Sequence, residues 1–150
     1  PGARQQVHHA LVFLEEPGVE QRRQQGGLNG FFAGYAPGNV GVRFPEGSAK
    51  RLPKGAWLKF QMHYTPNGTA VSDLTELGFQ FADAPPTAEV VTSAAADVRF
   101  EIPPGAPNHQ VVAERRFPVA GKLVSYFPHM HVRGKAFRME LILPDSTVRP

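Results

Sequence analysis

The sequence contains no cysteine. This absence excludes disulfide bonds, thiolate metal sites and a cysteine nucleophile together. The fold must then be stabilised by its apolar core, because no covalent cross-link is available. The large aromatic side chains that we expect in this core are Phe31, Phe32, Trp57, Phe60, Phe79, Phe81 and Phe117.

Long apolar runs and a strong net charge are also missing. No apolar stretch approaches the roughly 20 residues that a membrane-spanning helix needs, so we expect no membrane span. The net charge is only +3, and the pairs Arg22-Arg23 and Arg115-Arg116 are too short to form a basic stripe. Nucleic acid is therefore not an expected partner. With 150 residues, 41% of them hydrophobic, the chain can form one globular domain or two small ones.

Glycine and proline are abundant, with 15 of each, and they interrupt the apolar runs at intervals too short for long helices. This pattern predicts an all-β fold of short strands, most often a β-sandwich or jelly roll. A polar loop over 15–29 and turns near 36–39, 45–47, 53–55 and 66–68 should separate them. The expected strands cover residues 7–14, 31–35, 40–44, 57–65, 74–82, 98–102, 110–117, 122–127 and 136–143.

A proline-rich segment at 84–87, followed by Ser93 and three alanines, is the best candidate for a boundary between two subdomains. We therefore expect subdomains at 1–94 and 95–150. The chain starts with Pro1 rather than with a signal peptide, and it stops just after a strand-like run. We expect it to be a piece of a longer protein, with each subdomain incomplete at its chain end.

Five of the six histidines stand in or near strand-like runs. His129 and His131 would project from the same face of a strand, because strand side chains alternate. His8 and His9 would face opposite sides of a regular strand, so they can share one ion only if the backbone bends or if one ring binds through Nδ1 and the other through Nε2. His63 falls on a mixed polar face.

Each of these histidines has an ordinary structural interpretation when taken alone. His8 and His9 could be one core and one surface residue, and His63 could be a hydrogen-bonded side chain. His109 lies in an isolated turn, and we assign it no function. A bare His-x-His is a pattern of low specificity. The set of three histidine elements, with their contexts, favours a metal protein.

Those contexts are V-H-H-A-L-V-F, then R-L-P-K-G-A-W-L-K-F-Q-M-H-Y-T-P-N-G, then I-P-P-G-A-P-N-H and F-P-H-M-H-V-R-G-K. In this order they resemble the copper type II, ascorbate-dependent monooxygenases, the group of peptidylglycine α-hydroxylating monooxygenase and dopamine β-monooxygenase. The similarity is closest to bacterial relatives and covers most of the chain. It implies two jelly-roll subdomains with one copper ion each, in a periplasmic or extracellular protein.

By this resemblance His8, His9 and His63 match the three-histidine copper that stores and passes an electron. His129 and His131 match two ligands of the second copper, where O2 reacts with a small organic substrate, so they are the candidate catalytic residues. The third ligand of that copper is a methionine farther downstream, outside this chain. The resemblance also implies ascorbate or another reductant, with a possible fused or partner electron-transfer domain, and we expect the 150-residue chain to be inactive by itself.

Met62 and Met130 alternate away from the neighbouring histidines, so we interpret both as packing residues. The substrate stays unknown. Phe127 stands where the peptide-hydroxylating enzyme has an arginine for the substrate carboxylate, which argues against a peptide C-terminus. Arg133 and Lys135 are more typical of a surface turn.

Three other functions stay open. Imidazole ligands also suit a hydrolytic zinc site, but such a site needs a carboxylate as general base, and Glu15, Glu16 and Glu140 have no spacing that favours this role. A copper-binding electron-transfer β-sandwich without oxygenase activity is the second alternative. A metal-free β-sandwich binding domain with incidental histidines is the third.

Overall fold

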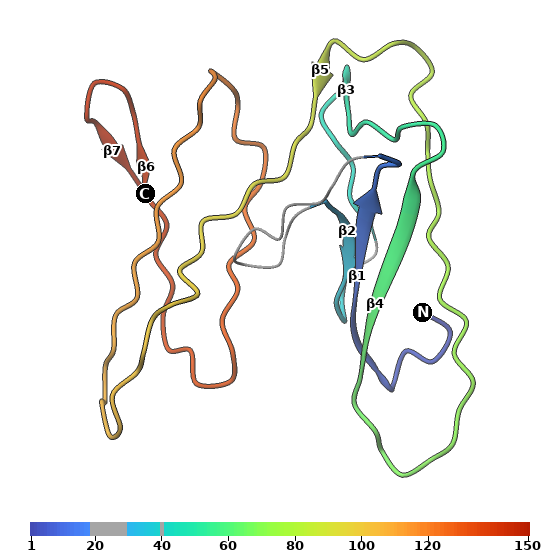
Figure 1. Cartoon of the computed structure of the whole chain (residues 1–150), viewed down its shortest axis with the longest axis horizontal. Helices are drawn as coiled ribbons and strands as arrows, with labels where there is room; N and C mark the ends of the chain where they lie inside the picture. Colours follow the sequence, from blue (N-terminus) through green and yellow to red (C-terminus); the bar gives the residue numbers. More distant parts are fainter. Residues whose placement is uncertain (19–29, 40) are drawn as a thin grey trace. The chain divides into compact units, whose positions relative to one another are not determined.

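A computed structural model describes residues 1–18, 30–39 and 41–150 of the chain. These residues form strands and no helix, which confirms the all-β prediction (Figure 1). None of them belongs to an apolar helix of membrane-spanning length. The strands are β1 (Val7–Glu15), β2 (Phe31–Tyr35), β3 (Ser48–Ala49), β4 (Trp57–Tyr64), β5 (Ala88–Glu89), β6 (Leu141–Ile142) and β7 (Val148–Arg149).

The main sheet has three strands in the order β2-β1-β4, and both pairings are antiparallel (Figure 1). β1 is the longest of the three, and it takes the central place, where both of its edges are hydrogen-bonded. Its side chains Val7, Ala10 and Val12 are buried and form the core of the described structure. The predicted strands over 7–14, 31–35 and 57–65 are thus confirmed to within one residue at their ends.

The remaining strands form two small ladders, in which β3 pairs with β5 in parallel and β6 pairs with β7 antiparallel. Several predicted turns are present. The N–H of Asn39 donates to the Ala36 carbonyl at 2.9 Å, that of Ser48 to Pro45 at 3.0 Å and that of Ala56 to Pro53 at 3.2 Å. Gly55 has a φ of 76° within its turn, which explains why glycine occupies that position.

Several predicted strands are absent. Residues 41–44, 74–82, 98–102, 110–117 and 122–127 carry no assigned strand, and only Leu141–Ile142 of the predicted 136–143 does. Alternation and β propensity specify an extended backbone, whereas a strand also needs a neighbouring backbone to complete its hydrogen-bonded ladder. The described part of the chain supplies such a neighbour mainly around β1.

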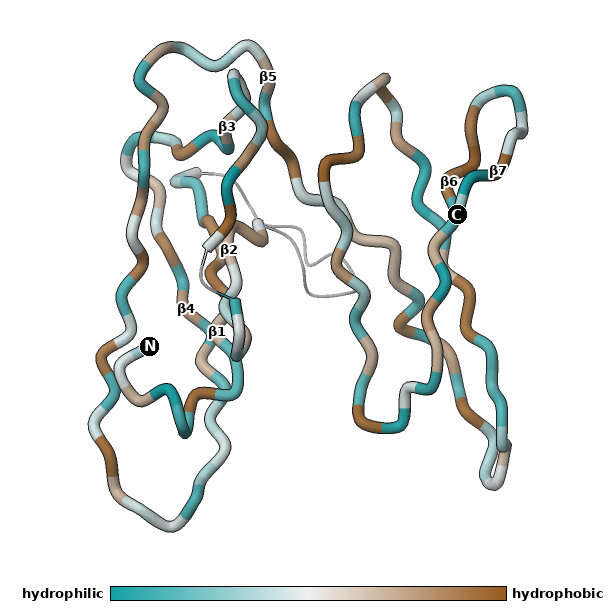
Figure 2. The backbone as a smooth tube through the Cα atoms, turned by 180° about the vertical axis from the view of Figure 1, so that it is seen from behind, coloured by the Kyte–Doolittle hydropathy of each residue, from teal (hydrophilic) through white to brown (hydrophobic). Residues whose placement is uncertain are grey.

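The predicted aromatic core is wrong in most positions. Trp57 is 73% exposed and Phe81 72% exposed, whereas Phe31 and Phe32 are half-buried. The brown apolar positions in Figure 2 recur along strands and extended segments alike. Their burial therefore depends on a second layer covering them, which hydrophobicity alone does not guarantee. The other members of the predicted core, Phe60, Phe79 and Phe117, are also more exposed than buried-core side chains.

The chain divides into two compact units, Pro1–Pro118 and Val119–Pro150. The subdomain boundary expected between residues 94 and 95 stays a prediction of the sequence. Most of the expected loop over 15–29, with the Arg22-Arg23 pair, lies outside the described residues, as does residue 40 of the expected strand at 40–44. His8, His9 and His63 lie in the first unit, and His129 and His131 lie in the second.

Candidate metal centre

A β-bulge in β1 brings His8 and His9 to the same side of the sheet. In the pairing of β1 with β4, Val7 lies opposite Tyr64 and His9 lies opposite His63, so β1 has one extra residue, His8. The burial pattern agrees, since Val7 and Ala10 are both buried while the two histidines between them are exposed or half-exposed. This bend is one of the two conditions under which adjacent histidines were expected to share an ion.

The rings of His8, His9 and His63 form one group, which we call the three-histidine cluster. Nδ1 of His8 lies 2.9 Å from Nδ1 of His9, and Nε2 of His9 lies 3.3 Å from Nδ1 of His63. The ring centroids are 4.6 to 5.5 Å apart. Each ring thus neighbours the other two, and His9 has a ring nitrogen within 3.3 Å of a nitrogen of each of them.

The cluster fits a metal ion by its donor set. One nitrogen from each ring lies within 4.8 Å of the others, and all three ligands are imidazoles. Two imidazole nitrogens that bind one zinc ion at about 2.0–2.1 Å can be at most about 4.2 Å apart. Rotation of the exposed rings of His8 and His63 would bring the nitrogens within this distance. Neutral imidazoles suit copper as well as zinc, so the donor set alone does not select the metal.

The carboxylates nearest in sequence to the cluster are already engaged. Lys59 Nζ lies 3.4 Å from Glu15 Oε1, and Arg51 donates two hydrogen bonds to Glu16 at 3.0 and 3.2 Å. The group of described residues that could ligate a metal ion contains histidines alone. The arrangement therefore offers ligands for an ion, while neither glutamate is placed as a general base beside it.

His129 and His131 also lie together, in the unit Val119–Pro150. Their Nε2 atoms are 3.2 Å apart and their rings meet edge to face at 5.0 Å. Both side chains are exposed, and the backbone here forms no assigned strand but leads into a turn in which Gly134 N–H donates to the His131 carbonyl at 2.7 Å. The predicted convergence of the two imidazoles is therefore present without the predicted strand.

The remaining residues of interest fall outside these two groups. His109 is exposed and joins neither of them. Met62 is half-buried opposite Ala10, as expected for a packing residue, whereas Met130 is 45% exposed. The Glu140 carboxylate pairs with Arg138.

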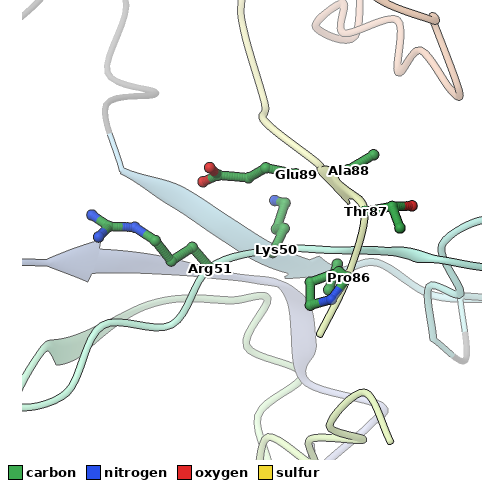
Figure 3. A pocket seen from close by; sticks show the side chains of 7 residues that line it. Lys50, Arg51, Pro86, Thr87, Ala88 and Glu89 are labelled. Atoms are coloured by element: carbon green, nitrogen blue, oxygen red, sulfur yellow. The ribbon is translucent and has the colours of Figure 1, made fainter. Parts of the chain in front are cut away.

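A pocket of about 270 Å³ lies between β3 and β5 and is lined by Lys50, Arg51 and Glu89, with none of the histidines (Figure 3). Lys50 Nζ donates to the carbonyl of Phe32 at 2.7 Å and lies 5.5 Å from the ring centroids of both Phe31 and Phe32. Its partial burial lowers the pKa of the Lys50 amine. These bonds engage the amine, so Lys50 connects β2 to the β3 segment.

One polar centre in the same unit as the three-histidine cluster was not expected from the sequence. Asp73 accepts hydrogen bonds from the N–H of Ala3, the hydroxyl of Tyr64 and the hydroxyl of Thr75. The Asp-x-Thr spacing suggests a local turn bond to Thr75. The bonds to Ala3 and Tyr64 link distant parts of the chain, and no local pattern signals them.

No protein-family model matches the chain, and comparison with curated proteins and with solved structures gives no match either.

Proposed function

We propose that the chain is part of a copper-dependent monooxygenase that hydroxylates a C–H bond with O2 and electrons from ascorbate or another reductant. The observation that carries the proposal is the three-histidine cluster, in which a bulge turns two adjacent imidazoles toward a third on the neighbouring strand. The same residues carry the sequence resemblance to the two-copper monooxygenases.

Copper bound by imidazoles cycles between Cu(I) and Cu(II) by one electron, which is the chemistry that the metal would supply. His8, His9 and His63 would hold the ion that stores an electron. His129 and His131 would hold the ion beside the reacting O2 and substrate, with a methionine outside the chain as the third ligand. In the overall reaction one oxygen atom enters the C–H bond to give an alcohol, and the other leaves as water after uptake of two electrons and two protons.

The proposed architecture is two jelly-roll subdomains, divided between residues 94 and 95, in a periplasmic or extracellular protein. A fused or partner electron-transfer domain would supply electrons where ascorbate does not. Phe127, two residues before His129, is 78% exposed. An aromatic side chain at this position cannot pair with a carboxylate, so we propose an uncharged small organic substrate rather than a peptide C-terminus.

Redox cycling tests the proposal on this chain. The protein is loaded with Cu(II), reduced with ascorbate under nitrogen and then exposed to O2, while the Cu(II) electron paramagnetic resonance signal is followed. We expect the signal to disappear on reduction and to return with oxygen. A signal that ascorbate cannot reduce would contradict the proposal, and tight binding of Zn²⁺ with no copper bound would favour the hydrolytic alternative instead.

A further inference from the structure

Asp73 lies where the two segments that carry the three-histidine cluster come together. Its Oδ1 accepts the N–H of Ala3 at 2.9 Å, and its Oδ2 accepts the hydroxyl of Tyr64 at 3.0 Å. Ala3 precedes the histidines of β1, and Tyr64 directly follows His63 on β4. The two oxygens of one carboxylate thus hold the turn that precedes β1 and the last residue of β4.

The connection from Asp73 to His8 is continuous. The Ala3 carbonyl accepts the N–H groups of Gln6 and Val7, both at 3.0 Å, and so closes the turn that leads into β1. The N–H of Thr65 donates to the Gln6 carbonyl at 2.7 Å, and this bond joins the turn to the end of β4. Gln6 is buried, so the turn is a packed part of the structure.

The connection from Asp73 to His63 is shorter. Tyr64 pairs with Val7 across the β1–β4 ladder, next to the bulge that turns His8 outward. Fixing the Tyr64 hydroxyl on Asp73 restrains the last residues of β4 against this bulge. Tyr64 directly follows His63 in the chain. A displaced Tyr64 would therefore shift the position of His63 relative to His9.

Thr75 also donates a hydrogen bond to the Asp73 carboxylate. Unlike the bonds from Ala3 and Tyr64, this bond does not involve either segment that carries the histidines. The Thr75 hydroxyl donates to Asp73 Oδ2 at 2.8 Å, two residues away in sequence. This local bond holds the carboxylate in place, whereas the bonds from Ala3 and Tyr64 transmit that placement to the strands. The side-chain bonds from Tyr64 and Thr75 can therefore be removed one at a time by substitution.

We infer that Asp73 is a positioning residue for the three-histidine cluster, which sets the separation of His8 and His9 from His63 by holding Ala3 and Tyr64 on one carboxylate. The inference rests on the proposed function, since it requires that the cluster bind copper. It assigns Asp73 no contact with the metal and no part in the reaction itself.

Copper binding by a small set of matched variants tests the inference. Asp73→Leu removes all three bonds with a side chain of similar size, and Tyr64→Phe removes only the bond to β4. Thr75→Val removes the local bond alone, and Asp97→Asn removes a carboxylate charge from a different turn, where Asp97 accepts the N–H of Arg99 at 2.9 Å. For each variant the dissociation constant for Cu(II), the electron paramagnetic resonance spectrum and the thermal stability are measured, all in a His129→Ala background that isolates the cluster.

We expect Asp73→Leu and Tyr64→Phe to weaken Cu(II) binding by about tenfold and to change the copper hyperfine coupling, as loss of an orienting partner does at other metal sites. Thr75→Val and Asp97→Asn should bind Cu(II) within about twofold of the parent protein and keep its spectrum. Asp73→Asn should recover much of the affinity, because its amide oxygen can still accept the N–H of Ala3.

Two results would overturn the inference while leaving the proposed function intact. In the first, the parent binds copper and all variants match it in affinity and spectrum. In the second, Thr75→Val loses as much affinity as Tyr64→Phe, and the losses follow thermal stability rather than the bonds removed. A parent protein that binds no copper at the cluster would instead overturn the proposed function, and the role of Asp73 with it.

Discussion

His9 and His63 lie directly opposite each other on β1 and β4, with Nε2 of His9 3.3 Å from Nδ1 of His63. Antiparallel pairing places these two side chains on one face of the sheet. The extra residue in β1 then adds His8 to the same face. The register of β1 against β4 therefore determines which histidines meet in the candidate metal centre.

The first prediction concerns His9, whose ring nitrogens lie closest to both other rings of the cluster. His9→Ala removes the imidazole that neighbours both His8 and His63, so we expect the Cu(II) dissociation constant at this site to rise by at least about tenfold. Isothermal titration in a His129→Ala background measures the change. His109→Ala, which removes an exposed histidine outside both groups, should bind copper like the parent protein. Equal loss in both variants would mean that the histidines bind copper nonspecifically.

The second prediction concerns the turn after the His129 and His131 pair. A Cβ added at Gly134 would lie 2.5 Å from Cβ and 2.9 Å from Sδ of Met130, the residue between the two histidines. Gly134→Ala must therefore displace Met130, and we expect it to weaken Cu(II) binding by the pair by about tenfold.

The matched control for Gly134→Ala is Gly121→Ala, in the same unit, where an added Cβ would meet nothing within 4 Å. Both variants are measured in a His9→Ala background, so that the pair alone is compared. If Gly134→Ala and Gly121→Ala bind Cu(II) with the same affinity, the placement of Met130 has no bearing on the pair.

The third prediction concerns acid stability of the metal-free protein. Hydrogen bonds, chiefly from Ala3 N–H and then from Thr75 and Tyr64, hold the pKa of Asp73 below its usual value of 3.8. A carboxyl group whose pKa is lowered by folding stabilises the folded state above its unfolded pKa, and this contribution is lost as the pH falls through the folded pKa. The difference in free energy of unfolding between the parent and Asp73→Asn should therefore be constant near neutral pH and shrink below about pH 4.

Urea unfolding of the two proteins at several pH values measures that difference directly. A difference that persists unchanged at the lowest pH would show that ionised Asp73 does not contribute in this way. Tyr64→Phe provides a second comparison, because it keeps the carboxylate and removes one of its donors.

The fourth prediction concerns the link between β2 and the β3 segment. Lys50→Met keeps much of the aliphatic side chain but removes the hydrogen bond to the Phe32 carbonyl and the contact of the cation with the two aromatic rings. In the parent protein, desolvation of the amine offsets part of the stabilisation that these contacts provide. We therefore expect Lys50→Met to lower the free energy of unfolding by about 1 kcal/mol. Lys54→Met, at an exposed turn position, should change it by less than about 0.5 kcal/mol. An unchanged stability in Lys50→Met would mean that desolvation of the amine cancels its bonds.

The sequence predicts the strands of the main sheet well because local pattern and tertiary environment agree there. The run at β1 is apolar enough for a central strand, and β4 alternates in a way that puts His63 on the polar face. Trp57 belongs to that same polar face, two positions before Lys59. Its 73% exposure follows from this alternation, and the prediction that Trp57 is a core residue gave its size too much weight.

The bulge at His8 and the bonds of Asp73 could not be predicted in the same way. Whether β1 contains an extra residue depends on how it pairs with β4, more than 40 positions away in the chain. The partners of Asp73 are likewise brought together by the turn at Ala3 and the end of β4. Sequence patterns identified the histidines as candidates, whereas their convergence required the register of the sheet.

Titration of the metal-free chain with Cu(II), followed by electron paramagnetic resonance, shows whether the three-histidine cluster is a copper site. We expect a type II copper signal with nitrogen hyperfine structure, which saturates at one ion for the three-histidine cluster in a His129→Ala background and which needs at least about tenfold more Cu(II) and changes its hyperfine pattern when His9→Ala is added. A protein that gives no nitrogen-ligated copper signal, or a signal that His9→Ala leaves unchanged, would contradict this expectation.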